Sequence, residues 1–189
     1  IKGQVNEDWS ATAMLENTQT FTGADAFKGE EDTSFQRAYV NGKLGGLKVQ
    51  AGRYNFADFL GGLVHDDRVD GVQVSYGKDV KVTAAVAKAT DWGKDERNGH
   101  DMAYVEAATK LGVVDAKAAW YRVDETMGED VGFDTEVYAI QAGLPLAKDL
   151  KFAATYFFNE TDGIDDYYSH DMMDDGFVLA LNYKGAKAA

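Results

Sequence analysis

The stretch RAYVNGKLGGLKVQAGRY, Arg37–Tyr54, carries two alternating runs on either side of Gly45-Gly46. Successive side chains of a strand point to opposite faces, and a glycine pair suits the positive backbone angles of a two-residue hairpin turn. The predicted cross-strand pairs are Leu44 with Leu47, Lys43 with Lys48, Asn41 with Gln50, Tyr39 with Gly52, and Arg37 with Tyr54. The last four pairs share one polar face, so we expect this face of the hairpin to meet water.

The same period of two recurs along the whole chain. It is clearest in Gly176–Lys184, where Phe177, Leu179, Leu181 and Tyr183 share one face. Twenty glycines and a single proline also favour strands joined by turns. We therefore expect an all-β fold of about eleven strands. The predicted strands are 2–5, 9–20, 34–44, 47–55, 69–77, 80–90, 102–111, 113–121, 137–146, 150–159 and 176–184.

The connections between these strands alternate between two lengths. The short ones are 6–8, 45–46, 77–79, 112–113 and 147–149, and the long ones are 21–33, 56–68, 91–101, 124–136 and 160–175. An up-and-down antiparallel meander with tight turns at one end and long loops at the other is typical of a transmembrane β-barrel. No apolar run is long enough for a transmembrane helix, whereas a barrel strand needs only about 9 to 11 residues.

The charges divide in the same way as the loops. About 24 of the 32 acidic residues lie in the long loops, and lysines gather near the short turns. The net charge of -13 argues against nucleic acid as a partner. An acidic mouth would concentrate cations, although a charge run is more often simply a solvated surface. The chain has no cysteine, which excludes disulfides and thiolate metal sites.

The polar face of the strands is a candidate pore wall, because paired lysines are easiest to solvate in a wide aqueous lumen. Alternation places Arg53 on the lipid side, where an arginine is costly. We expect a β-bulge at Gly52 that turns Arg53 inward. The candidate pore-lining residues are Arg37, Tyr39, Lys43, Lys48, Gln50, Arg53, Glu106, Lys110, Lys117 and Tyr121.

The predicted loop 56–68 contains apolar residues that no strand would bury, Phe59 and Leu60 among them. A loop folded inward against the barrel wall would bury them, and so would packing against a neighbouring subunit. We take the inward fold as the working hypothesis. The candidate constriction-loop residues are Asp58, Phe59, Leu60, Gly61, Gly62, His65, Asp66 and Asp67.

Residues suited to catalysis or metal binding are sparse. His65, His100 and His170 each lie beside an aspartate in a different long loop, which suggests general-base chemistry but is more typical of solvated side chains. The aspartates of 162–175 lack the regular ligand order of a calcium loop. We expect no enzymatic activity, no cofactor and no metal.

The stretch LKVQAGRYNFADFLGGLVHDDRVDGVQVSYGKDVKVTAAVAK, Leu47–Lys88, resembles the barrel of general bacterial porins. It is most similar to the OmpM-type porins, which carry an S-layer-homology stalk ahead of the barrel. The features that carry the resemblance are Gly52-Arg53-Tyr54, Val69-Asp70-Gly71-Val72 and the hairpin through Gly77.

The resemblance implies an outer-membrane diffusion channel of about 16 strands, a homotrimer, with one loop folded into the lumen. This sequence holds no such stalk and begins within a strand, so we expect 1–189 to be a single barrel segment that is incomplete at both ends. The expected partners are outer-membrane lipid, small hydrophilic solutes and ions. The alternatives are a soluble or surface-exposed binding module or adhesin that uses its acidic loops, and an outer-membrane barrel enzyme.

Overall fold

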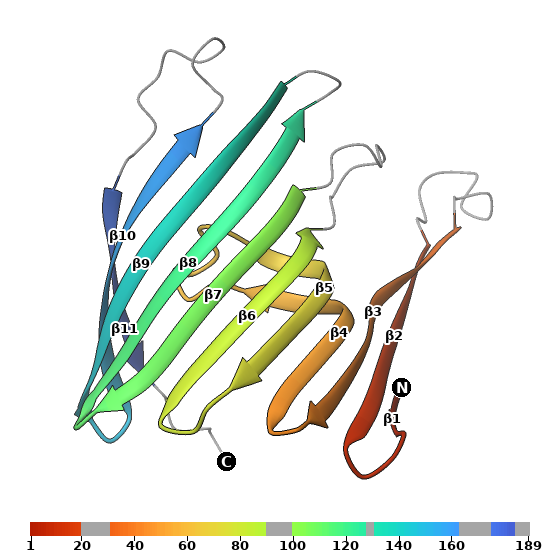
Figure 1. Ribbon diagram of the computed structural model, residues 1–189, viewed down its shortest axis with the longest axis horizontal. Coiled ribbons are helices and arrows are strands. Elements are labelled where there is room, and N and C mark those ends of the chain that lie inside the picture. The colour runs from red at the N-terminus through yellow and green to blue at the C-terminus, as the bar shows by residue number, and fades with distance from the viewer. Residues whose placement is uncertain (20–30, 90–99, 128–130, 163–174, 184–189) are drawn as a thin grey trace.

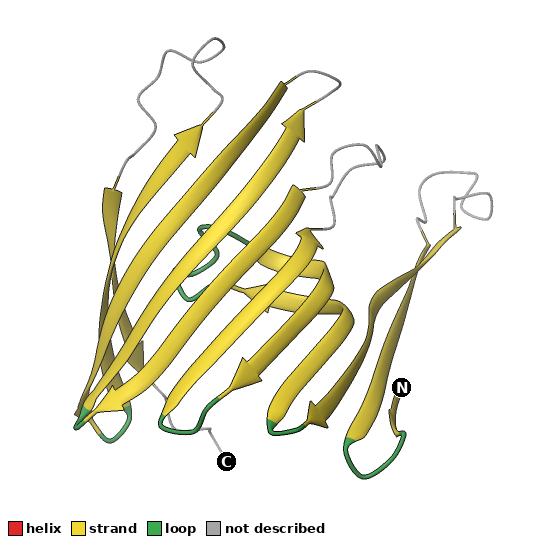
Figure 2. Cartoon of the chain, viewed as in Figure 1, coloured by secondary structure: helices red, strands yellow, loops and turns green. Residues whose placement is uncertain are grey.

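Eleven antiparallel strands in sequence order form one sheet in the computed structural model (Figures 1 and 2). The structure describes residues 1–19, 31–89, 100–127, 131–162 and 175–183. No helix long and apolar enough to cross a membrane occurs in these ranges. The predicted all-β, up-and-down architecture is confirmed. The strands are β1 (Lys2–Gln4), β2 (Trp9–Gln19), β3 (Glu31–Leu44), β4 (Leu47–Ala57), β5 (Asp66–Tyr76), β6 (Val80–Ala89), β7 (His100–Leu111), β8 (Val114–Met127), β9 (Val131–Ala147), β10 (Leu150–Asp162) and β11 (Asp175–Tyr183).

The sheet curves into a wall with a concave inner face (Figure 1). Within the described residues β1 and β11 are its two edges and do not pair with each other. The strands are tilted, and the tight turns gather at one rim (Figure 2). The Gly45-Gly46 turn has φ of 55° and 89°, values that glycine adopts without the strain that a side chain would bring. This turn sets the register that the sequence predicts for the pairs from Leu44↔Leu47 to Tyr39↔Gly52.

The outer face carries a continuous apolar band. On β11 the outward residues Phe177 and Tyr183 are 74% and 70% exposed, whereas the inward residues Val178 and Ala180 are half-buried. Other exposed large apolar side chains on this face are Val72, Tyr76, Val80, Val82, Val86, Val105, Leu111, Ile140, Leu144, Leu146, Phe158, Leu179 and Leu181. An exposed apolar surface of this extent is what a barrel turns towards lipid.

The hairpin of β8 and β9 is longer than the sequence predicts. Most of the predicted loop 124–136 is strand, with pairing that continues from Asp124↔Asp134 to Met127↔Val131. Alternation of apolar residues is lost there because the outward positions are charged. Arg122 donates to Asp124 of its own strand at 2.7 Å and to Asp134 of β9 at 2.8 Å, so ion pairs replace the apolar contacts.

The upper halves of β4 and β5 leave the wall and turn across its inner face (Figure 1). Pairing of β3 with β4 ends at Ala38↔Arg53, and pairing of β5 with β6 ends at Val69↔Ala89, whereas β4 and β5 stay paired to Ala57↔Asp66. The predicted pair of Arg37 with Tyr54 therefore does not form. β3 continues without β4 on that side, and Arg37 pairs with Met14 of β2.

Two glycines face each other where the hairpin bends inward. Gly52 pairs with Gly71 across β4 and β5. A Cβ on Gly52 would lie 2.3 Å from the carbonyl oxygen of Ala38, and one on Gly71 would lie 2.5 Å from that of Val86. Gly52 also has φ of 116°, a conformation that other residues rarely adopt. The bend therefore depends on the absence of side chains at both positions.

We predict that Gly52→Ala destabilises the fold by about 2 kcal/mol or more, because it adds both backbone strain and a clash with the Ala38 carbonyl. Gly61→Ala is the matched control, since Gly61 has φ of 86° but a Cβ added there would have no atom within 4 Å. Guanidinium unfolding in detergent, followed by tryptophan fluorescence, measures both variants. Equal midpoints for the two would show that the close approach at Gly52 does not matter.

Candidate pore wall and inward loop

The loop between β4 and β5, Asp58–His65, is organised by one buried carboxylate. Asp58 Oδ1 accepts the backbone N–H groups of Leu60 at 2.7 Å and Gly62 at 3.1 Å. Its Oδ2 accepts those of Val64 at 2.7 Å and His65 at 2.8 Å. The side chain of Asp58 thus replaces the backbone partners that a loop lacks. Asp58 is 5% exposed, so its charge does not face the lumen.

This loop packs against the inner face of β7, β8 and β9. Leu60 is 4% exposed, and the Phe59 ring lies 6.3 Å from that of Tyr121 on β8. Just before the loop, Phe56 stacks on Tyr104 of β7 at 4.4 Å. Gln141 of β9 donates to the carbonyl oxygen of Phe59 at 3.4 Å, across 82 positions of sequence. Phe59 and Leu60 therefore point into the wall of the same chain.

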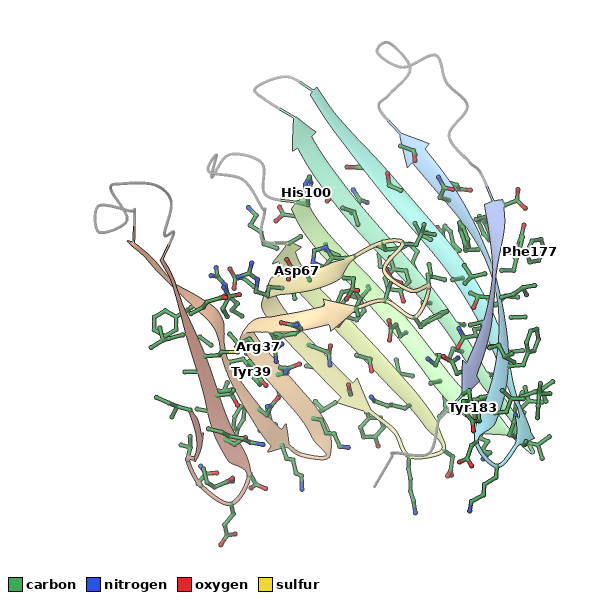
Figure 3. The ribbon with its side chains drawn as sticks, turned by 180° about the vertical axis from the view of Figure 1, so that it is seen from behind. Arg37, Tyr39, Asp67, His100, Phe177 and Tyr183 are labelled. Carbon is green, nitrogen blue, oxygen red and sulfur yellow. The ribbon has the colours of Figure 1, made fainter. Side chains whose placement is uncertain are left out.

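The predicted constriction-loop residues separate into two groups. Asp58 to His65 form the loop, whereas Asp66 and Asp67 belong to β5 and pair with Ala57 and Phe56. Figure 3 shows Asp67 on the part of β5 that crosses the inner face. The predicted loop 56–68 is longer than the observed one, because Asp66 and Asp67, which the sequence assigns to the loop, belong to the start of β5. His65 stacks on Phe56 at 6.3 Å and its Nε2 lies 3.3 Å from the carbonyl oxygen of Arg68.

Most of the predicted pore-lining residues share the inner face with the loop. Lys43 and Lys48 face each other across the ladder, as do Tyr39 and Gly52. Figure 3 shows Arg37 together with Tyr39 on this face of β3. Lys43, Lys48 and Gln50 line a hollow of about 350 Å³, and Lys110 and Lys117 line a second of about 610 Å³. Glu106 accepts a hydrogen bond from Tyr121 at 2.7 Å.

Arg53 lies on the outer face, so the predicted bulge at Gly52 is wrong. The register of β4 runs unbroken through Gly52 against both neighbouring strands. The guanidinium donates to the two carboxylate oxygens of Asp70 at 2.8 and 2.6 Å, and to the carbonyl oxygen of Phe35 at 3.2 Å. The bidentate carboxylate balances the charge of the arginine on the outer face, so no bulge is needed to turn the side chain inward.

Tyr121 faces inward, as predicted, but it does not line open water. Its side chain is 0% exposed because the loop covers it. Together with Tyr54, Tyr104 and Phe56 it forms an aromatic cluster between the inward hairpin and the wall. Alternation alone predicts that these aromatic rings face inward, but it does not predict that a loop covers them.

Asp58 and Gln141 are the residues whose roles the sequence did not reveal. An aspartate shortly before a Gly-Gly pair is a signal for a side chain that bonds to its own loop backbone, so this role could have been predicted. Gln141 gave no such signal, because its contact with Phe59 depends on how far the hairpin bends. His170 and most of the acidic stretch 162–175 lie outside the described residues. Among the described residues no cluster of three potential metal ligands occurs.

We predict that Asp58→Ala releases the loop, because four backbone N–H groups lose a charged acceptor. Each such bond contributes about 1.5 to 3 kcal/mol, so protection of the amides of residues 60, 62, 64 and 65 should fall at least about tenfold in hydrogen exchange. Asp66→Ala removes a neighbouring carboxylate from β5 and serves as the control. Unchanged protection in Asp58→Ala would mean that wall contacts alone hold the loop.

Neither a protein-family model nor a curated protein matches the sequence. Solved structures of OmpT, an outer membrane protein of Vibrio cholerae, are similar in fold. The loop L8 deletion mutant has a TM-score of 0.53 at 13% identity, with 98% of this chain and 78% of that chain covered. The in-vitro folded trimer form gives 0.51 at 14% identity, with 98% and 74% covered. Another in-vitro folded OmpT structure gives 0.51 at 15% identity, with 98% and 72% covered. The chain thus shares its fold with β-barrels of the bacterial outer membrane, and its exposed apolar band lies on the face that such a barrel turns towards lipid.

Proposed function

We propose that the chain forms the wall of a porin, a water-filled channel through which small hydrophilic solutes and ions diffuse across the outer membrane. The observation that carries the proposal is the contrast between the two faces of the same strands. The outer face exposes an apolar band, whereas the inner face carries lysines and amides beside two hollows and is crossed by the Asp58–His65 loop.

Selection in such a channel needs no chemical step. The inward loop narrows the lumen and so limits the size of the solutes that pass. The charged groups on the wall set the electric field that a solute meets. We propose that the finer properties follow the general porins: about 16 strands in the complete barrel, a homotrimer, and kinship with the OmpM-type porins. We also propose that the chain is not an enzyme and that it holds no cofactor.

The alternative of a soluble binding module or adhesin is less well supported. A soluble barrel would leave Phe177, Leu179 and Leu181 in water at 74%, 69% and 65% exposure on one strand. A surface of that kind is costly outside a membrane or a protein interface. A soluble module would also remain folded and monodisperse without detergent, which the proposed channel would not.

The test of the channel is conductance of the full-length, detergent-extracted protein in a planar bilayer, where stepwise openings are expected. Because the chain has no cysteine, a single cysteine can report on each face. We predict that a charged, water-soluble thiol reagent reduces the current through Lys117→Cys, which faces the lumen. The matched control is Ala118→Cys, one residue along and on the outer face, where the current should not change. No stepwise conductance, or equal block of both variants, would contradict the proposal.

Ion preference follows from the acidic long loops, and we propose that they favour cations at that mouth. With a KCl gradient across the bilayer, the reversal potential of the full-length channel should have the sign of cation preference. The preference should weaken at high salt because screening shortens the reach of the loop charges. A reversal potential of anion-preferring sign at low salt would remove this part of the proposal.

A further inference from the structure

The hollow between the loop and the wall combines positive charge with an apolar floor. Its volume is about 610 Å³. Lys110, Lys117 and Lys151 line it from β7, β8 and β10, together with the carboxylates Asp79 and Asp115. The remaining lining residues are Phe59, Leu60, Gly61, Ala108, Thr109, Gln141, Ala153, Thr155, Val178, Ala180 and Asn182.

The lysines are grouped around one carboxylate. Asp115 forms an ion pair with Lys151, and it also attracts Lys110 and Lys117 electrostatically. Among the described residues, neither Lys110 nor Lys117 makes an ion pair within 4.0 Å. The hollow is lined by three ammonium groups and two carboxylates, so one positive charge is left that a bound anion would balance.

The apolar part of the hollow has no evident use in a wall that only needs to meet water. The other hollow of the inner face is lined mostly by polar residues such as Lys43, Lys48 and Gln50. Between the loop and the wall, the apolar floor is made by Ala108, Ala153, Val178 and Ala180, which line the hollow together with Phe59. The Lys117 ammonium lies 5.2 Å from the centre of the Phe59 ring. An apolar floor beside unpaired ammonium groups is the usual composition of a site for a small molecule with an apolar body and an anionic end.

We propose that this hollow is a binding site for small amphipathic carboxylates. Lys117 and Lys110 hold the carboxylate, and the apolar body lies between the Phe59 ring and the floor at Val178 and Ala180. The site deepens the proposed channel and rests on it, because the loop and the wall of the lumen form its two sides. A solute of this class would pause beside the loop on its way through the lumen.

The first test is binding, and it does not require a functioning channel. The probe is 3-phenylpropionate, followed by saturation-transfer NMR on the full-length protein in detergent. Lys110→Gln/Lys117→Gln should weaken binding by about tenfold or more, the loss expected when charge-assisted hydrogen bonds are removed. Lys148→Gln removes a lysine from the neighbouring β9–β10 turn, outside the hollow, and should bind like the unaltered protein. Because micelle uptake of the probe is the same for all variants, it cancels in the comparison.

Two comparisons separate this site from simple charge attraction. The uncharged 3-phenylpropionamide should bind at least about tenfold more weakly than the carboxylate. Val178→Asn leaves every lysine in place and should weaken the binding of 3-phenylpropionate but not that of acetate. If acetate binds as tightly as 3-phenylpropionate, or if the double lysine variant binds normally, the proposal is overturned. Circular dichroism and gel mobility of the unheated protein establish that each variant is folded.

The second test is block of the potassium current by 3-phenylpropionate added on either side. The unaltered channel should be blocked, and Lys110→Gln/Lys117→Gln should need about tenfold more blocker. Binding without any stepwise conductance would refute the channel and support the site. Conductance without lysine-dependent binding or block would refute the site and leave the channel intact.

Discussion

Backbone hydrogen bonding is the constraint on which this structure depends. A strand that faces lipid has no water to satisfy its N–H and C=O groups, so each neighbouring strand must do so. Inside the described sheet, away from its edges at β1, β2 and β11, the antiparallel ladder meets this need except where β4 and β5 turn inward. At that point β3 loses its neighbour above Ala38, and the Arg53 guanidinium supplies a donor to the carbonyl oxygen of Phe35. Arg53 is thus part of the solution to a backbone problem, and Asp70 balances its charge.

How much of this the sequence predicts depends on how local each feature is. The register of the Gly45-Gly46 hairpin follows from alternation and from the turn, and the four pairs nearest the turn are as predicted. The fifth pair, Arg37 with Tyr54, fails because the bend of β4 is a tertiary event that a period of two does not encode. Arg53 is a second case of this kind. The cost of an arginine in lipid suggested a bulge, whereas in the structure a carboxylate on β5 balances the charge of Arg53.

The inward loop shows a similar division. Unburied apolar residues near Gly61-Gly62 suggested that the loop finds a surface to pack on, and Leu60 is buried against the wall. The sequence did not show that Asp58 would direct its charge to the loop backbone. Four of its contacts are to N–H groups within seven residues, so the information was local, although an aspartate in an acidic loop is more often simply solvated. The hollow beside the loop is lined by three lysines and two aspartates, a more basic balance than the acidic composition of the chain suggests.

Pairing of β4 with β3 stops at Arg53, and pairing of β5 with β6 stops at Val69. This separates the residues that hold the wall together from those that fill the space inside it. The part of β4 that ends at Arg53 and the part of β5 that begins at Val69 pair with the wall strands β3 and β6. Residues 54–68 instead form the part of the hairpin that crosses the inner face. The tip of the hairpin, Asp58–His65, contributes no rung to the ladder between β3 and β4 or between β5 and β6. In the proposed channel, changes at this tip would therefore alter the width of the passage while those wall pairings stay in place.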